Sequence, residues 1–372
     1  MSADSHNLPD TFFQVPRRFV LQWHITDVCN SNCGHCYRDM TEAPITMDFA
    51  HRQTIIHQYE TQLQLFRSHR PVHGLITITG GEPFLDPGLP SLLQLLHAKK
   101  ESFSFAILSN GTLIDTGIIE LLRSFPPGFV QVSLDGMQPV HDGIRGRGAF
   151  EKAVQGIRLL VDAGIRTLVS FTASRTNYRE LPLVAAFVGK LGVTRMWTDR
   201  MIPLGQGGRT ADEVLSSDEA LEYCRLLRYA RLRSALHVFR NFQVAAGRAL
   251  QFLKCGGDPY ACNAGRGLLA VLPNGDVYPC RRLPKKVGQI PDQSLSWIYS
   301  NNSYLQKLRS PRQVSSGCER CRHRYTCRGG AKCMAYAIRG TAFAADPGCW
   351  KASWVAKNIS RSVTEGYTSC SK

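Results

Sequence analysis

The chain has 372 residues, of which 43% are hydrophobic and 20% charged, and its formal net charge is +16 at pH 7. This length and composition are typical of a globular protein with one large domain and a smaller one. No apolar run approaches the roughly 18 residues of a membrane span, and the polar segment 1–18 lacks the apolar stretch of a signal peptide. We therefore expect a cytoplasmic protein, in which the clustered spacing of most of its thirteen cysteines indicates metal binding rather than disulfides.

Strand-like and helix-like segments alternate along the first half of the chain. After the first strand, an amphipathic helix is expected from Met47 to His69. The predicted strands are 19–26, 75–79, 103–108, 129–134, 166–172 and 193–198, and the predicted helices between them are 88–100, 115–124, 149–163 and 178–190. This alternation is typical of βα units and a parallel sheet. It predicts an α/β fold, a partial (β/α)6 TIM-like barrel, with the chemistry at the carboxyl ends of the strands.

The character of the sequence changes after the sixth predicted strand. A long helix is expected over 217–236, followed by another that ends at Leu253. The C-terminal quarter is rich in Cys, Arg and Gly and has few apolar runs, which favours a small module held together by metal. The predicted domains are an N-terminal extension (1–18), the barrel (19–210), a helical linker (211–253), the metal-bound module (254–350) and a tail (351–372).

Three cysteines follow the first predicted strand with the spacing C-x3-C-x2-C, at Cys29, Cys33 and Cys36. Thiolates favour iron–sulfur clusters or zinc. Three of them can hold three corners of a [4Fe–4S] cluster and leave one iron open for reaction, whereas a structural zinc knuckle is the alternative. The triplet resembles that of the radical S-adenosylmethionine (radical SAM) enzymes. The resemblance implies that these cysteines are the catalytic ligands of a cluster whose open iron binds S-adenosylmethionine (AdoMet).

A glycine-rich motif follows the second predicted strand. It reads Gly80-Gly81-Glu82-Pro83. Its two glycines allow a close approach of the backbone to a ligand, and Glu82 can accept a hydrogen bond from an ammonium group. In the radical SAM family such a GGEP element binds the methionine amino group of AdoMet, and an ordinary turn is the alternative.

Further polar residues end the third and fourth predicted strands. Ser109 and Asn110 follow the third strand and Ser133 lies at the end of the fourth, so they should converge on one mouth, as the ribose and carboxylate of a ligand require. The resemblance implies that these residues contact AdoMet. It also implies that Arg145 pairs with the AdoMet carboxylate, and a structural pair with Asp142 is the alternative.

The remaining cysteine motifs lie in the C-terminal quarter. Cys262 and Cys280 flank a predicted hairpin over 268–279, which carries an Asn-Gly turn. The cysteine pattern resembles the SPASM extension of peptide-modifying radical SAM enzymes, although its last step is two residues longer than the usual C-x3-C. Two zinc ions are the alternative. The resemblance implies two auxiliary [4Fe–4S] clusters, one held by Cys255, Cys262, Cys280 and Cys333 and the other by Cys318, Cys321, Cys327 and Cys349.

Two cysteines fall outside these sets. Cys224 lies in a helical pattern, so we expect a buried apolar residue there. Cys370 lies in the predicted tail. A role for either residue as a proton or hydrogen donor is the alternative.

The radical SAM resemblance also implies a reaction class. One electron enters AdoMet, which splits into methionine and a 5′-deoxyadenosyl radical, and this radical abstracts hydrogen from an unactivated carbon. A reductase, a flavodoxin or a ferredoxin would supply the electron. The auxiliary clusters would take an electron back from the substrate or relay one inward.

The residues after the hairpin bear on the substrate. Sulfatase-maturing enzymes resemble this layout but have an Asp directly after the second hairpin cysteine, where this chain has Arg281 and Arg282. The arginines suit a carboxylate-bearing peptide, and compensation of cluster charge is the alternative. Modification of a ribosomally made peptide is the leading hypothesis. Because fewer than 20 residues precede the first strand, we expect either a separate leader-recognition protein or direct binding of the leader by the basic C-terminal module. A carboxylate-rich haem or quinone cofactor precursor is the alternative.

The positive charge is uneven. Residues 254–350 hold 15 Lys and Arg against 5 Asp and Glu, and three bound clusters would lower the net charge of the whole chain to about +11. The excess would attract an acidic peptide or nucleic acid, or offset the anionic clusters. Because no RNA- or DNA-binding motif accompanies it, a nucleic-acid partner is not expected. A zinc-bearing nucleic-acid-binding module remains the alternative from another class, but GGEP has no role in it.

Overall fold

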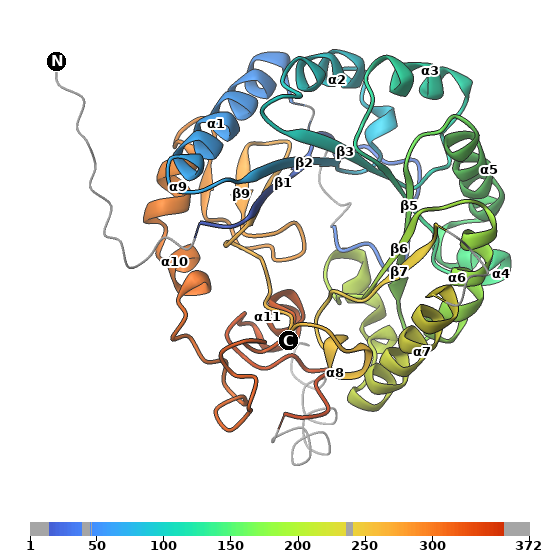
Figure 1. The fold of residues 1–372 in the computed structure, drawn as a ribbon, viewed down its shortest axis with the longest axis vertical. Helices are drawn as coiled ribbons and strands as arrows, with labels where there is room; N and C mark the ends of the chain where they lie inside the picture. Colours follow the sequence, from blue (N-terminus) through green and yellow to red (C-terminus); the bar gives the residue numbers. More distant parts are fainter. Residues whose placement is uncertain (1–14, 39–44, 46, 236–240, 353–372) are drawn as a thin grey trace, which may run out of the picture.

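A curved, mostly parallel sheet forms the centre of the protein in the computed structural model, which describes residues 15–38, 45, 47–235 and 241–352. The sheet does not close into a full barrel (Figure 1), and its strand order is β10-β9-β8-β1-β2-β3-β4-β5-β6-β7. The strands are β1 (Arg18–His24), β2 (His73–Thr79), β3 (Ser104–Ser109), β4 (Val130–Ser133), β5 (Thr167–Ala173), β6 (Arg195–Arg200), β7 (Gln243–Ala245), β8 (Leu268–Val271), β9 (Asp276–Tyr278) and β10 (Gly288–Gln289).

Helices cover the outer, convex side of this sheet (Figure 1). They are α1 (Phe49–Arg67), α2 (Leu89–Ala98), α3 (Thr116–Ser124), α4 (Gln138–Arg145), α5 (Ala149–Asp162), α6 (Leu181–Lys190) and α7 (Ser217–Ala235), with short 3-10 turns η1 (Pro83–Leu85), η2 (Tyr178–Glu180) and η3 (Gly205–Glu213). The C-terminal part adds α8 (Phe252–Cys255), α9 (Leu295–Asn301), α10 (Ser303–Arg309) and α11 (Lys332–Arg339). No helix within the described residues has both the length and the apolar character to cross a membrane.

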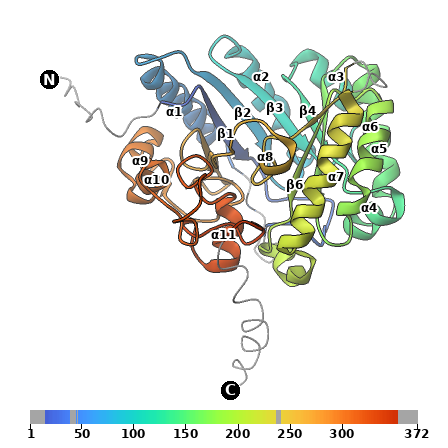
Figure 2. The same cartoon turned by 60° about the horizontal axis from the view of Figure 1, so that its bottom comes forward.

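The C-terminal hairpin continues the sheet of the barrel. Strand β8 pairs in parallel with β1, from Val20 opposite Leu268 to Trp23 opposite Val271, and β9 returns antiparallel to β8. The C-terminal segment fills the open side of the curved sheet in Figure 1, and Figure 2 shows α9 and α10 near α1. The hairpin therefore belongs to the same hydrogen-bonded sheet as the barrel.

The hydrophobic core runs through this junction. Phe19 on β1 is fully buried, and its ring lies 5.7 Å from that of Tyr59 on α1 and 5.8 Å from that of Tyr299 on α9. The Tyr59 hydroxyl donates to the Phe19 carbonyl at 2.7 Å and accepts from the Leu75 amide at 2.8 Å. Because one aromatic cluster joins elements from both ends of the chain, the barrel and the C-terminal segment share a core.

The six predicted strands are all present, and their parallel pairing is confirmed. The hairpin with an Asn-Gly turn is confirmed as well, as β8 and β9. The second helix expected to end at Leu253 is wrong, because β7 and the one-turn helix α8 occupy the described part of this segment. Its Ala, Leu, Gln and Arg residues favour a helix, but Val244 is buried beside β6 in a seventh parallel strand.

Candidate active site

The cysteine triplet lies in the loop that follows β1, and the GGEP backbone holds the start of this loop. The Gly81 amide donates to the Thr26 carbonyl and the Glu82 amide donates to the Val28 carbonyl, each at 2.8 Å. A Cβ atom on Gly81 would lie 2.0 Å from the Val28 carbonyl oxygen. The close approach of two backbones therefore requires glycine at position 81.

Two other segments hold the triplet loop from further along the chain. The Gly207 amide donates to the Cys36 carbonyl at 2.9 Å, so the Gly-rich turn after β6 fixes the end of the triplet. The Gly34 amide donates to the Ile144 carbonyl at 3.1 Å, and the Asn110 side chain donates to that of Asn30 at 2.8 Å. The loop is thus positioned by α4 and by the ends of β2, β3 and β6.

Glu82 lies behind the cavity wall rather than in it. Its carboxylate is fully buried and accepts from the Ser109 hydroxyl and from the Asn110 amide, each at 2.8 Å. Burial raises the pKa of Glu82 to about 7, although these hydrogen bonds favour the charged form. Gly80, Gly81, Ser109, Asn110 and Ser133 line the cavity itself, whereas Pro83 is buried at the start of η1. The role of Glu82 toward an ammonium group stays a prediction.

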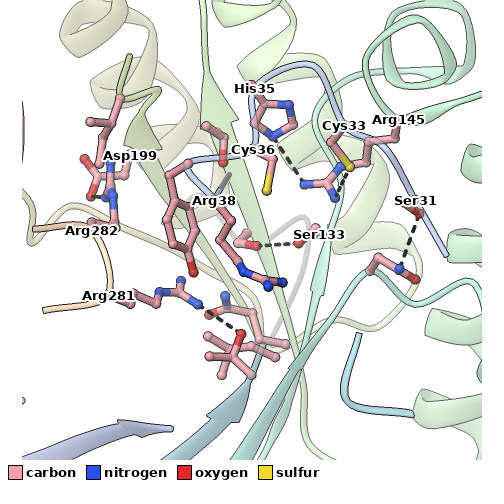
Figure 3. Close-up of a pocket in the computed structure, with 18 of the residues that line it drawn as sticks. Ser31, Cys33, His35, Cys36, Arg38, Ser133, Arg145, Asp199, Arg281 and Arg282 are labelled. Carbon is pink, nitrogen blue, oxygen red and sulfur yellow. Dashed lines mark hydrogen bonds and ion pairs between the residues drawn. The ribbon is translucent and has the colours of Figure 1, made fainter. Parts of the chain in front are cut away.

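Arg145 lies between the triplet and the buried carboxylate of Asp135. Its Nε donates to Asp135 Oδ2 at 2.6 Å, and its Nη1 is 3.6 Å from Cys33 Sγ (Figure 3). His35 Nε2 is 3.3 Å from the same Asp135 oxygen. Although burial opposes the shift, Arg145 and His35 hold the pKa of Asp135 well below its usual range. The alternative pair with Asp142 is not formed, because Asp142 accepts from the first amides of α5.

The segment after Cys280 joins the C-terminal part to the barrel. Arg282 forms an ion pair with Asp199 at the end of β6 and donates to the Arg200 carbonyl at 2.6 Å. The Arg281 side chain donates to Thr79 Oγ1 at 3.3 Å. Farther along, Arg200 Nη1 donates to Asp346 Oδ1 at 3.0 Å. Polar contacts therefore connect this part to β2 and β6.

A cavity of about 220 Å³ lies at the centre of these residues, at the carboxyl ends of the parallel strands. It is bounded by the triplet loop, the ends of β2 to β6 and the segment after Cys280. The charged residues that line it, apart from the cysteines and His35, are Asp199 and the arginines Arg38, Arg145, Arg200, Arg248, Arg281 and Arg282. The cavity is therefore strongly cationic.

Four cysteines surround a second, smaller cavity. Cys318, Cys321, Cys327 and Cys349 line a space of about 20 Å³. Burial, together with the neighbouring thiols, raises the pKa of Cys318 to about 12. Four thiols on one cavity are a donor set whose chemistry suits an iron–sulfur cluster. Within the described residues, no group of three or more Cys, His, Asp or Glu side chains is placed to hold a single metal ion.

The other predicted set comes together only in part. Burial raises the pKa of Cys333 to about 12, and the nearby thiols of Cys262 and Cys280 act in the same direction. Cys255 instead lies at the end of α8, where its Sγ is 3.7 Å from the carbonyl oxygen of Cys224. The assignment of Cys255 to the first auxiliary cluster stays a prediction. Cys224 is buried in α7 as expected, and Cys370 falls outside the described residues.

Several residues that line the cavity were not anticipated from the sequence. Trp197 lies within β6 and Asp199 near its carboxyl end, Tyr37 directly follows the triplet, and Arg248 comes from the loop between β7 and α8. The rule that strand ends gather at one mouth would have identified Asp199. No local pattern marks Arg248, because its position depends on β7.

Comparison with known proteins identifies two domains. The profile of the radical SAM superfamily matches residues 23–182, and that of the SPASM iron–sulfur cluster-binding domain matches residues 262–323. An AdoMet-dependent heme synthase of Methanosarcina barkeri is 26% identical over 352 residues, which cover 89% of this chain and 95% of that relative. A mycofactocin maturase, MftC, of Mycobacterium ulcerans is 29% identical over 327 residues, which cover 85% of this chain and 82% of that relative.

Solved structures show the same fold. Streptococcus suis SuiB bound to S-adenosylmethionine matches with a TM-score of 0.71 at 16% identity, over 90% of this chain and 77% of that one. SuiB has also been solved with its precursor peptide SuiA. That structure matches with a TM-score of 0.67 at 14% identity, over 90% of this chain and 76% of that one.

Proposed function

Because this chain belongs to the radical SAM superfamily and carries a SPASM domain, we propose that it modifies a ribosomally synthesised peptide after abstracting hydrogen from one of its carbons. When bound to the cluster, AdoMet supplies the 5′-deoxyadenosyl radical that makes this abstraction feasible. The protein's own residues bind the cofactor, orient the substrate and exclude water.

The cavity wall beside the triplet is the proposed AdoMet site. Cys29, Cys33 and Cys36 would hold the catalytic [4Fe–4S] cluster. Gly80, Gly81, Ser109, Asn110 and Ser133 border the cavity next to them and would contact AdoMet. Arg145 would pair with its carboxylate while remaining bonded to Asp135 through Nε, since its other nitrogens face Cys33 and His35.

The C-terminal cysteines are the proposed auxiliary ligands. The four thiols around the small cavity would hold one [4Fe–4S] cluster. Cys262, Cys280 and Cys333 would hold another, with Cys255 as the proposed fourth ligand. Electrons would come from a flavodoxin, a ferredoxin or a reductase, in the cytoplasm, where thiols stay reduced.

The observation that carries the substrate proposal is that the barrel and the C-terminal part share the cationic cavity. Six arginines and one aspartate line it, and such a lining favours a carboxylate-bearing substrate. The similarity to a mycofactocin maturase and the fold shared with SuiB support a peptide. A separate leader-recognition protein would deliver it.

A haem precursor is the second candidate. The observation that favours it is the similarity to an AdoMet-dependent heme synthase over 95% of that relative. The carboxylates of a tetrapyrrole would pair with the same arginines in the cavity.

Deuterium transfer tests the proposal. The anaerobically purified protein would be given AdoMet, dithionite and a deuterated peptide encoded beside its gene. We expect deuterium in 5′-deoxyadenosine and a changed peptide mass. Deuterium transfer from coproporphyrin III instead of the peptide would favour the second candidate, and no AdoMet cleavage at all would refute the radical reaction.

A further inference from the structure

The cavity holds more guanidinium groups than carboxylates to pair with them. Four of its arginines have a carboxylate partner within the described residues, and the pairs are Arg38 with Asp27, Arg145 with Asp135, Arg200 with Asp346, and Arg282 with Asp199. Arg281 and Arg248 also line the cavity, but neither forms an ion pair with another described residue. Four of the six arginines are therefore paired with a carboxylate in the described part of the chain, and Arg281 and Arg248 are not.

The backbone of Arg281 is held by a hydrogen bond, but one hydrogen-bond donor of its side chain has no partner among the residues that the structure describes. Its amide donates to the Gln22 side chain at 3.1 Å, and its guanidinium donates to Thr79 at 3.3 Å and lies 5.8 Å from the ring centre of Tyr37. Its Nε is buried and finds no hydrogen-bond partner in the described part of the chain. An unsatisfied donor on a buried charged group is costly, and a carboxylate bound where Arg281 lines the cavity would offset that cost.

Arg248 is the second unmatched guanidinium. It is exposed and lies over the Trp197 ring, 5.1 Å from its centre. Arg195 lies 5.4 Å from the centre of the same ring but does not line the cavity. Arg195 is therefore a matched control for any effect of charge or of stacking on Trp197.

We propose that Arg281 and Arg248 bind substrate carboxylates and thereby determine which substrates enter the cavity. The proposal rests on the function proposed above, and it deepens that function by assigning the side chains that recognise the substrate. A guanidinium presents a planar fork of donors that matches the two oxygens of a carboxylate.

These two arginines differ from Arg145 in their surroundings. Arg145 contacts Cys33, which makes it part of the proposed AdoMet site. Arg281 follows Cys280, and Arg248 precedes α8, so both reach the cavity from the segments that follow β6. A substrate that enters between these segments and the triplet would meet them first.

Equilibrium dialysis with two pairs of probes tests the proposal on the anaerobically purified, cluster-loaded full chain in the presence of AdoMet. One pair is a rhodamine-labelled Ala-Ala-Glu-Ala-Ala-amide and its Gln counterpart. The other pair is coproporphyrin III and its tetraamide. We expect the wild type to prefer the acid in at least one pair by about tenfold or more, since charged hydrogen bonds contribute that much.

The variants decide whether these side chains cause the preference. Arg281→Gln and Arg248→Gln should each weaken binding of the acid by about tenfold to a hundredfold and leave binding of the neutral probe unchanged. Arg281→Lys should retain part of the preference, and Arg195→Gln all of it. Thermal unfolding and iron content confirm that each variant is folded and loaded.

Three results would overturn the proposal. They are equal binding of the acid and neutral probes by the wild type, an undiminished preference for the acid in both Gln variants, or a loss of AdoMet affinity in Arg281→Gln as large as its loss of affinity for the acid probe. The test is distinct from that of the proposed function. A preference for coproporphyrin III alone would uphold the carboxylate site and count against the peptide, whereas deuterium transfer tests the radical reaction whether or not the carboxylate site exists.

Discussion

Replacing Gly81 by Ala should remove the catalytic cluster without unfolding the sheet. The added Cβ would lie 2.0 Å from the Val28 carbonyl oxygen and 2.8 Å from that of Asp27, whereas real Cβ contacts below 3.0 Å are essentially never seen. The obstacle is backbone, so the triplet loop would have to move by about 1 Å. That movement would break the amide bonds to Thr26 and Val28, worth about 1 kcal/mol each. Overpacking adds about 1–3 kcal/mol, which makes the total about 3–5 kcal/mol.

This cost is smaller than the stability of a typical domain, so the damage should stay local. The assay is iron content after anaerobic purification, followed by 5′-deoxyadenosine formation from AdoMet with dithionite. We expect about eight irons instead of about twelve, and no cleavage. The control is Gly143→Ala on α4, where the added Cβ meets no atom within 4 Å. If Gly81→Ala kept about twelve irons and cleaved AdoMet like the wild type, the reasoning would be refuted.

Three further predictions concern Cys349, Glu82 and Arg145. Cys349→Ala should lose about four of about twelve irons while AdoMet cleavage persists, and retention of all the iron would contradict the four-thiol site. Burial raises the pKa of Glu82 from 4.5 to about 7, so the folded state holds a proton that the unfolded state has already released between these pH values. This contribution to stability is fully present below pH 4.5 and is lost as the pH rises through 7, which lowers the free energy of unfolding by up to about 3 kcal/mol between pH 4.5 and 8. The Glu82→Gln variant should not show this decrease when its free energy of unfolding is measured by urea denaturation at each pH; a pH profile like that of the wild type would contradict this. Arg145→Ala should destabilise by about 3–5 kcal/mol because it removes the guanidinium partner of the buried Asp135 and leaves His35 as its remaining side-chain partner within the described residues, and adding Asp135→Asn should restore much of that loss; a double variant no more stable than the single one would disprove the coupling.

The strands of the barrel were predictable because burial on both faces gives short, nearly continuous apolar runs. The run 166–172, for example, became β5 with a shift of one residue at each end. Strand β7 was missed for the opposite reason. It has only three residues, and their strand conformation depends on pairing with β6, a contact that local propensity does not encode.

The site was predictable where chemistry lies in local spacing. The triplet, the two glycines of the GGEP element and the polar strand ends do gather at one mouth. Partners set by tertiary packing were not predictable, since Asp135 rather than Asp142 binds Arg145 and Cys255 lies beside Cys224. Sequence spacing indicates which residues share a chemistry, but it does not fix which of two nearby carboxylates or thiols lies within reach.

The two walls of the cavity differ in how freely their residues could change. The wall beside the triplet is built from backbone amides and tightly packed glycines such as Gly81, so a substitution there displaces the triplet loop. On the wall formed by the segment after Cys280, Arg281 is held by its amide, and its side chain donates to Thr79 at the end of β2. Exchange of the side chain at position 281 would therefore cost that hydrogen bond but leave the amide contact in place. Loops on a rigid scaffold commonly carry specificity, and on this reasoning proteins of the same fold would acquire different substrates through this wall while keeping one cofactor site.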